Sequence, residues 1–229
     1  MTKKYDIFLF DADNTLYDFN KAEANALKIM FDYCGFNYTK GILARYREIS
    51  APVWDSYEKN EISLEELQTL RFVRLFTDIG VFHDADDFNT RYLAELGKGA
   101  FLIDGALEIC REISANNKQI FIITNGIQTT QKSKIKYSPI KDYITDFFVS
   151  EFVGHRKPER AYFEYVLSHI PQVEKDRILI VGDSLTADIA GGNNTGIDTC
   201  WFNEHECVNN TNIVPVYEIR ALSQIQRFI

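Results

Sequence analysis

Two aspartates one residue apart, Asp11 and Asp13, follow a run of apolar β-forming residues in the segment IFLFDADNTLY. A buried strand that ends in this way places two carboxylates where the chain emerges into solvent. Such a pair either closes a turn or forms a reaction centre. Side chains at alternate positions of an extended segment face the same way, so both carboxylates can address one group.

Polar groups of the kind that phosphate chemistry uses also follow other apolar runs. The segment TNG (124–126) ends QIFIIT, GHRKP (154–158) lies just beyond DFFVS, and GDSLTAD (182–188) ends RILIVG. Each alone fits a turn or a helix start, with Pro158 at the first helical position. Together they indicate one ligand site, because ligands of open α/β sheets bind outside the carboxyl ends of the strands.

The apolar runs predict the elements that position these groups. Strands are expected at 5–10, 119–124, 146–150, 177–182 and 198–202, and helices at 106–115 and 161–170 between them. Strands that alternate with helices form a parallel sheet, and the unbroken apolar runs suit strands covered on both faces. The predicted fold is a doubly wound α/β sheet, Rossmann-like, which ends in VPVYEI and a final helix, ALSQIQRFI.

More than a hundred residues separate the first two runs, far more than one crossover needs. The pattern there is helical, and Ser63 with Glu66 three residues later forms a capping-box signature. We therefore predict an all-helical cap at 17–92, inserted into a catalytic core of 1–16 and 93–229. Its aromatic residues are expected to form the cap's own core, with ligand contact as the alternative; they include Phe31, Tyr33, Tyr46, Trp54, Tyr57 and Phe72.

Composition excludes several classes of function. The net charge is −8 and basic residues are dispersed, which argues against a nucleic-acid polymer as partner. No apolar run approaches the roughly 18 to 20 residues of a membrane span, and no secretory segment is evident, so we expect a cytoplasmic protein. The composition leaves the oligomeric state open.

The cysteines point to neither a disulfide framework nor a zinc site. They are scattered without CxxC spacing, which fits reduced thiols; they are Cys34, Cys110, Cys200 and Cys207. His205 and Cys207 lie together in a polar stretch without further ligands. Both are expected at the surface rather than on a metal.

The four motifs resemble those of the haloacid dehalogenase-like phosphohydrolase superfamily, of the type with a helical cap. They match Asp11-x-Asp13-x-Thr15, Thr124, Lys157 and Gly182-Asp183-x-x-x-x-Asp188. Finer segments such as FDADNTLYDF, IITNG and CWFNEH resemble the branch of pyrimidine 5′-nucleotidases. The resemblance implies hydrolysis of phosphomonoesters.

The resemblance also implies roles for the acidic residues. Asp11 would attack phosphorus and form an aspartyl-phosphate, and Asp13 would act as acid and then as base. Mg²⁺ would be held by the side chains of Asp11 and Asp183 and by the backbone carbonyl of Asp13. Asp188 is expected to orient Asp183, water or Lys157, and whether it touches the metal stays open.

The remaining motif residues would bind the phosphoryl group of a small phosphorylated substrate. Thr124 would donate its hydroxyl, Asn125 its backbone N–H, and Lys157 would place a positive charge there. Thr15 is expected to fix the loop, and Arg156 is assigned no role. Tyr17 and Phe19 join the cap aromatics as candidates for substrate choice.

The function implied is a magnesium-dependent phosphomonoesterase, a 5′-nucleotidase for pyrimidine or modified nucleoside monophosphates. A dehalogenase of the same fold needs no acid at the second position, so Asp13 argues against it. A sugar-phosphate phosphatase or phosphomutase remains an alternative. A catalytically inert phosphate-binding module is disfavoured, because Asp11, Asp13, Lys157 and Asp183 are all present.

Overall fold

The structure, a computed structural model, describes residues 3–229. The chain divides into two compact units, one made of the residues up to Asn20 with Ala100–Ile229, the other of Lys21–Gly99. The first unit is an α/β unit and the second is helical. No helix formed by residues 3–229 is long and apolar enough to cross a lipid bilayer.

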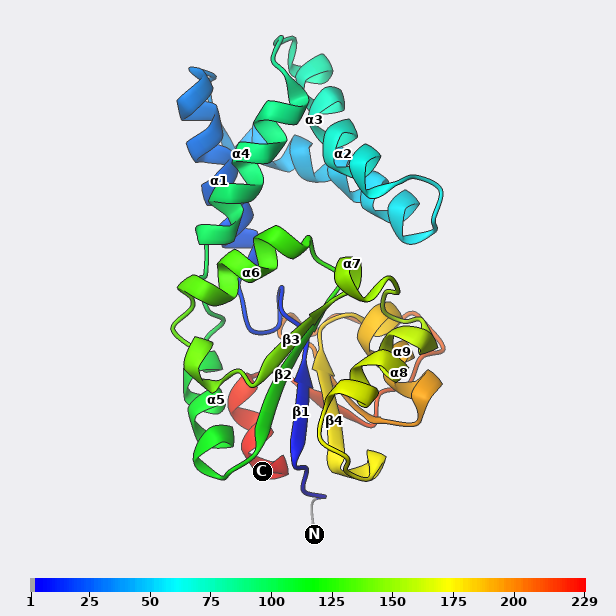
Figure 1. Cartoon of the computed structure of the whole chain (residues 1–229). Helices are drawn as coiled ribbons and strands as arrows, with labels where there is room; N and C mark the ends of the chain where they lie inside the picture. The colour runs from blue at the N-terminus through cyan, green and yellow to red at the C-terminus, as the bar shows by residue number, and fades with distance from the viewer. Residues whose placement is uncertain (1–2) are drawn as a thin grey trace. The chain divides into compact units, whose positions relative to one another are not determined.

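A six-stranded parallel sheet forms the centre of the α/β unit, with the strand order β3-β2-β1-β4-β5-β6. Figure 1 labels β1 to β4 of this sheet. The doubly wound sheet predicted from sequence is confirmed. Five strands lie where apolar runs predicted them, whereas β6, a three-residue edge strand within VPVYEI, was not predicted. The strands are β1 (Ile7–Phe10), β2 (Gln119–Thr124), β3 (Asp146–Val149), β4 (Ile178–Gly182), β5 (Asp198–Phe202) and β6 (Tyr217–Ile219).

Helices cover both faces of this sheet. One face packs on α5 and η4, and the other packs on α8, with α9 beside it (Figure 1). Alternate residues of β1 serve the two faces, Phe8 and Phe10 on one and Ile7 and Leu9 on the other, and all four are buried. This explains why the strand sequence shows no polar alternation.

The helices of the α/β unit confirm some predictions and correct others. The helix predicted at 106–115 is confirmed as α5, and the helix predicted at 161–170 is confirmed as α8, which begins one residue earlier at Arg160. The alternative in which Pro158 opens a helix is wrong, because Pro158 lies before α8 and follows a cis peptide bond. The C-terminal helix is a 3₁₀-helix, because its apolar residues recur every three positions, at Leu222, Ile225 and Phe228. The helices are α5 (Ala106–Ala115), α6 (Gln128–Tyr137), η1 (Lys141–Tyr143), α7 (Ser150–Val153), α8 (Arg160–His169), η2 (Lys175–Arg177), the π-turn η3 (Leu185–Ile189), α9 (Ala190–Thr195) and η4 (Leu222–Phe228).

Four helices build the helical unit, and the capping box predicted at Ser63 and Glu66 is confirmed at the start of α3. A left-handed glycine, Gly80, ends the same helix. The sequence-based division at 17–92 stays a prediction about domains. The helices are α1 (Phe19–Cys34), α2 (Lys40–Glu58), α3 (Leu64–Ile79) and α4 (Ala85–Lys98).

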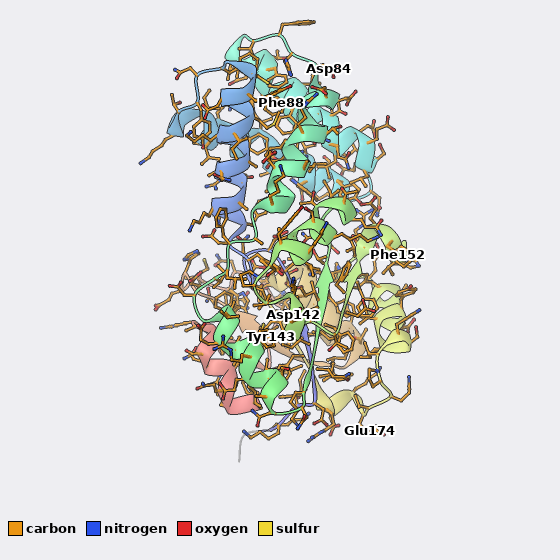
Figure 2. All side chains as sticks on the ribbon, turned by 60° about the vertical axis from the view of Figure 1, so that its left-hand side comes forward. Asp84, Phe88, Asp142, Tyr143, Phe152 and Glu174 are labelled. Atoms are coloured by element: carbon orange, nitrogen blue, oxygen red, sulfur yellow. The ribbon has the colours of Figure 1, made fainter. Side chains whose placement is uncertain are left out.

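Aromatic rings fill the core of the helical unit, as the sequence predicts. Phe72 lies at its centre, with ring centroids 5.4 Å from Tyr46 and 4.8 Å from Phe88, which is labelled in Figure 2. Phe31 is also buried, whereas Trp54 and Tyr57 are half-buried and pack against each other. Tyr33 is exposed, contrary to expectation, because its ring lies on the outer side of α1 against the Arg91 guanidinium.

All four cysteines are free thiols in the structure, as the sequence predicts. Cys110 and Cys200 are buried in the core on the face of the sheet that α5 and η4 cover, where burial raises the pKa of each thiol to about 12. His205 and Cys207 are both exposed, as expected.

Asp6 ties together the starts of the three central strands, and we predict a pH-dependent contribution to stability. Its carboxylate accepts hydrogen bonds from Arg177 (2.7 Å) before β4 and Lys118 (2.6 Å) before β2, which lower the pKa of Asp6 to about 2. Because the folded pKa lies below the unfolded value, this stability is present above about pH 4 and is lost as pH falls towards 2.

Asp6→Asn is therefore expected to lower the free energy of unfolding at pH 7 by about 1 kcal/mol, a value reduced for the partial exposure of the pair. Urea unfolding at pH 7, 5 and 3 checks this. The difference in the free energy of unfolding between the variant and the wild type should be smaller at pH 3 than at pH 7. Asp142→Asn, at an exposed aspartate labelled in Figure 2, is the control. A gap that is constant with pH would contradict the ion-pair account.

Candidate active site

The predicted site residues gather at one edge of the sheet because the strands are parallel. Asp11 follows β1, Thr124 ends β2 and Asp183 follows β4. Lys157 lies between α7 and α8, in the connection that follows β3. The chain runs from β1 to β2 and β3 on one side, then returns to β4 on the other side of β1. Ligands of such sheets bind at this reversal of strand order.

The loop after β1 is a tight turn that fixes the two predicted catalytic aspartates. The backbone N–H groups of Leu16 and Tyr17 both donate to the carbonyl of Ala12, at 3.0 and 2.9 Å. Asn14 adopts a left-handed conformation with φ 61°, which asparagine tolerates better than most residues. The Thr15 hydroxyl accepts a hydrogen bond from the backbone N–H of Asp183 (3.1 Å), so Thr15 fixes the loop as predicted.

Lys157 is buried at the centre of the site and contacts two acidic side chains. Its ammonium donates to Asp11 (2.5 Å), to Asp188 (2.7 Å) and to the carbonyl of Ile123 (2.9 Å). Burial acts to lower the pKa of Lys157, but the two carboxylates outweigh burial and raise it. Lys157 is therefore a fixed positive charge at neutral pH.

Three carboxylates converge beside this lysine. Oxygens of Asp11, Asp183 and Asp188 lie within 4.8 Å of one another. Burial, together with the neighbouring carboxylates, raises the pKa of Asp11 well above its usual range and that of Asp183 to about 7. Three acidic groups thus face one ammonium, and a divalent cation that prefers oxygen ligands fits this excess of negative charge.

Asp188 is held in place by backbone geometry. It lies in the π-turn η3, where one carboxylate oxygen accepts from the N–H of Ser184 (3.2 Å) and the other from Lys157. A Cβ at Gly182 would lie 2.2 Å from the Asp188 carboxylate, so only glycine fits there. The structure thus brings Asp188 against Lys157, one of the partners the sequence suggested for it.

Asn125 has a contact that the sequence did not predict. Its side-chain amide donates to the carbonyl of Lys157 and accepts from the N–H of Lys157, both at 2.9 Å. This two-way pair anchors the backbone of Lys157 to the loop after β2. The role predicted for Asn125, donation of its own backbone N–H to phosphate, stays a prediction.

Thr124 is buried, and Tyr162 of α8 fixes its backbone. The Thr124 N–H donates to the Tyr162 hydroxyl (3.1 Å), which in turn donates to the carbonyl of Phe148 (2.7 Å). The Thr124 hydroxyl oxygen accepts from the N–H of Gly126 (3.0 Å), which leaves its own proton to donate. Donation of that proton to a phosphoryl oxygen remains our expectation.

Arg156, to which the sequence analysis assigned no role, pairs with Glu159.

The Asp13 carboxylate is bound by two residues of α6 that the sequence reasoning missed. Gln131 donates to one oxygen (2.6 Å) and Lys134 to the other. The only sequence signal for them is their spacing of three residues on a helix that starts just after TNG. The negative charge of Asp13 is the smallest of the causes that raise the pKa of Asp183, after burial and the charge of Asp188.

Comparison with known proteins identifies the family of the chain. The sequence pattern that describes the haloacid dehalogenase-like hydrolases matches residues 8–202. The HAD-hydrolase YfnB of Bacillus subtilis (strain 168) is 37% identical over 227 residues, covering 99% of this chain and 96% of YfnB. Its crystal structure bound to magnesium has a TM-score of 0.91 and covers 97% of each chain.

Two further relatives are pyrimidine 5′-nucleotidases. PynA of Streptococcus pneumoniae (strain ATCC BAA-255 / R6) is 34% identical, covering 96% of this chain and 93% of PynA. YjjG of Escherichia coli (strain K12) is 29% identical, covering 99% of this chain and 98% of YjjG. Family pattern, whole-chain identity and fold agree, and the chain belongs to the haloacid dehalogenase-like hydrolase family.

Proposed function

We propose that the protein is a magnesium-dependent phosphomonoesterase that acts through an aspartyl-phosphate, with pyrimidine or modified nucleoside 5′-monophosphates as substrates. The observation that carries the proposal is the contact of Lys157 with Asp11 beside Asp183 and Asp188. This cluster combines a carboxylate that can act as nucleophile, a fixed positive charge on Lys157 and more oxygen ligands than the lysine alone can neutralise. The similarity to PynA and YjjG over nearly the whole chain supports the choice of substrate.

In the first half-reaction, an oxygen of Asp11 attacks phosphorus as the bond to the ester oxygen breaks. Asp13 gives its proton to that departing oxygen. Lys157 balances charge on the phosphoryl oxygens, and the Thr124 hydroxyl donates to one of them. The 2.5 Å contact between the Lys157 ammonium and Asp11 supports this role for Lys157.

In the second half-reaction, water attacks the phosphorus of the aspartyl-phosphate. Asp13, now a carboxylate, takes a proton from that water, and the bond from phosphorus to Asp11 breaks. Phosphate leaves, and both aspartates return to their starting states. Asp11 and Asp183, with the backbone carbonyl of Asp13, would hold Mg²⁺, which supplies charge neutralisation when bound. The magnesium-bound structure of YfnB supports the choice of metal.

A phosphate-release screen with the purified chain tests the proposal. The panel holds pyrimidine and purine nucleoside monophosphates, sugar phosphates and small organic monophosphates, each with Mg²⁺ and with EDTA. The highest kcat/KM is expected for a pyrimidine nucleoside monophosphate, and EDTA should reduce turnover by at least about a hundredfold. Absence of phosphate release from every compound would overturn the proposal. A preference for sugar phosphates would keep the phosphatase and change its substrate.

A further inference from the structure

Both oxygens of the Asp13 carboxylate are bound by one face of α6. Gln131 and Lys134 lie three positions apart and so face the same side of the helix. The Gln131 amide donates to Oδ2 at 2.6 Å, and the Lys134 ammonium donates to Oδ1. These contacts span 118 and 121 positions of the chain. They fix the carboxylate in one orientation.

The burial of Lys134 shows that its contact with Asp13 belongs to the interior of the protein. Its side chain is fully buried, and an ammonium is costly to bury unless it is paired. Among the acidic residues that the structure describes, Asp13 is its ion-pair partner. The rings of Tyr17 and Phe19 flank the ammonium, with centroids at 5.6 and 5.8 Å. The site therefore excludes water from Lys134 and directs its charge to Asp13.

Gln131 is held just as closely, by the loop that follows β2. Only 1% of its surface is exposed, and a Cβ at Gly126 would lie 2.2 Å from its side-chain nitrogen. Because Gly126 has no side chain, the Gln131 side chain can lie directly against the backbone of this loop. The loop that carries Thr124, the predicted phosphate ligand, also shapes the support for Asp13.

We propose that Gln131 and Lys134 are positioning residues that hold Asp13 for proton transfer. The inference rests on the proposed function, in which Asp13 protonates the leaving oxygen and later takes a proton from water. A carboxylate has about four lone-pair sites, and the two donors occupy one on each oxygen. The others stay available for the proton that is exchanged. Neither residue needs to touch the substrate.

The leaving group of the substrate provides a test. A nucleoside monophosphate expels an alkoxide, which needs a proton, whereas p-nitrophenyl phosphate expels a phenolate that departs without one. Lys134→Met and Gln131→Ala are each expected to lower kcat/KM for the nucleoside monophosphate by at least about tenfold, and that for p-nitrophenyl phosphate by less than about threefold. The ratio kcat/KM is used because it reports the steps up to formation of the aspartyl-phosphate.

Lys132→Met is the matched control, because Lys132 is an exposed lysine on the same helix. This variant should leave kcat/KM unchanged for both substrates. Gln131→Ala, which leaves the ammonium paired, gives the same readout if Lys134→Met does not fold. Equal losses on both substrates would show a merely structural role and overturn the proposal.

A double-mutant cycle supplies an independent readout. If Lys134 acts through Asp13, Lys134→Met should lower the residual nucleoside monophosphate activity of Asp13→Asn by less than about twofold, against at least about tenfold in the wild-type chain. A further loss of about tenfold in the Asp13→Asn background would contradict the inference. Failure of the proposed function looks different, because the wild-type chain would then release no phosphate from either substrate.

Discussion

Asp11→Asn is expected to abolish turnover, with kcat reduced by roughly four orders of magnitude or more. The amide has the shape of the carboxylate but does not attack phosphorus, so the aspartyl-phosphate cannot form. Its carbonyl oxygen can still accept from Lys157, which contacts Asp11 at 2.5 Å in the wild-type chain. Phosphate release from the best substrate of the screen measures the loss.

The same substitution is expected to raise stability in the absence of divalent cations. The buried carboxylates of Asp11 and Asp188 and the half-buried carboxylate of Asp183 lie close together, and burial with these neighbouring charges raises the pKa of Asp11. Removing one negative charge relieves that repulsion, so the thermal midpoint in EDTA should rise by a few degrees, about 1 kcal/mol or more in stability. Asp142→Asn, at an exposed site, should leave the midpoint unchanged.

The two readouts separate catalysis from folding. A variant that is stable and inactive has lost chemistry rather than structure. Turnover within about tenfold of the wild type would show that Asp11 is not the nucleophile. An unchanged or lower midpoint would show that the metal-free carboxylates do not repel one another as the geometry implies.

The apolar pattern of the sequence was sufficient to predict the sheet and the edge at which the motifs meet. Strands buried on both faces must be apolar throughout, so runs such as QIFIIT are visible in one sequence. The three-residue strand β6 is too short to give such a signal. The predicted Lys157 and Asp183 lie beside Asp11, because residues after parallel strands share one edge.

The residues that support Asp13 could not be found in this way. α6 buries Thr130, Gln131, Lys134 and Ile135, a mostly polar set that in sequence resembles a solvent-exposed helix face. A polar residue is buried favourably only when it has a partner, and the partner of Lys134 lies 121 positions away. Periodicity reports apolar faces and carries no information about such a pairing.

The helical unit shows the same limit. Arg71 is buried and donates to the Tyr46 hydroxyl and to the side-chain oxygen of Asn89, both at 3.1 Å. The aromatic content of the segment predicted a core there, but nothing local indicated a charged residue within it. Tyr33 is the opposite case, since an aromatic residue expected inside lies outside.

Lys157→Met is expected to remove turnover and also to destabilise the fold, the opposite of the stability change at Asp11. The substitution leaves Asp11 and Asp188 buried without their cation, and breaking a buried pair costs about 3 to 5 kcal/mol. The charge that stabilises the transition state is lost as well, so kcat should fall by at least about a thousandfold. Urea unfolding in EDTA and phosphate release measure the two effects.

Two comparisons identify the cause of the destabilisation. Lys132→Met, an exposed lysine changed in the same way, should alter neither stability nor activity. Adding Asp188→Asn to Lys157→Met removes one of the two stranded carboxylates, so it should recover part of the lost stability and none of the activity. If the double variant is no more stable than Lys157→Met, the loss comes from side-chain packing, and the buried charges do not govern the stability of this site.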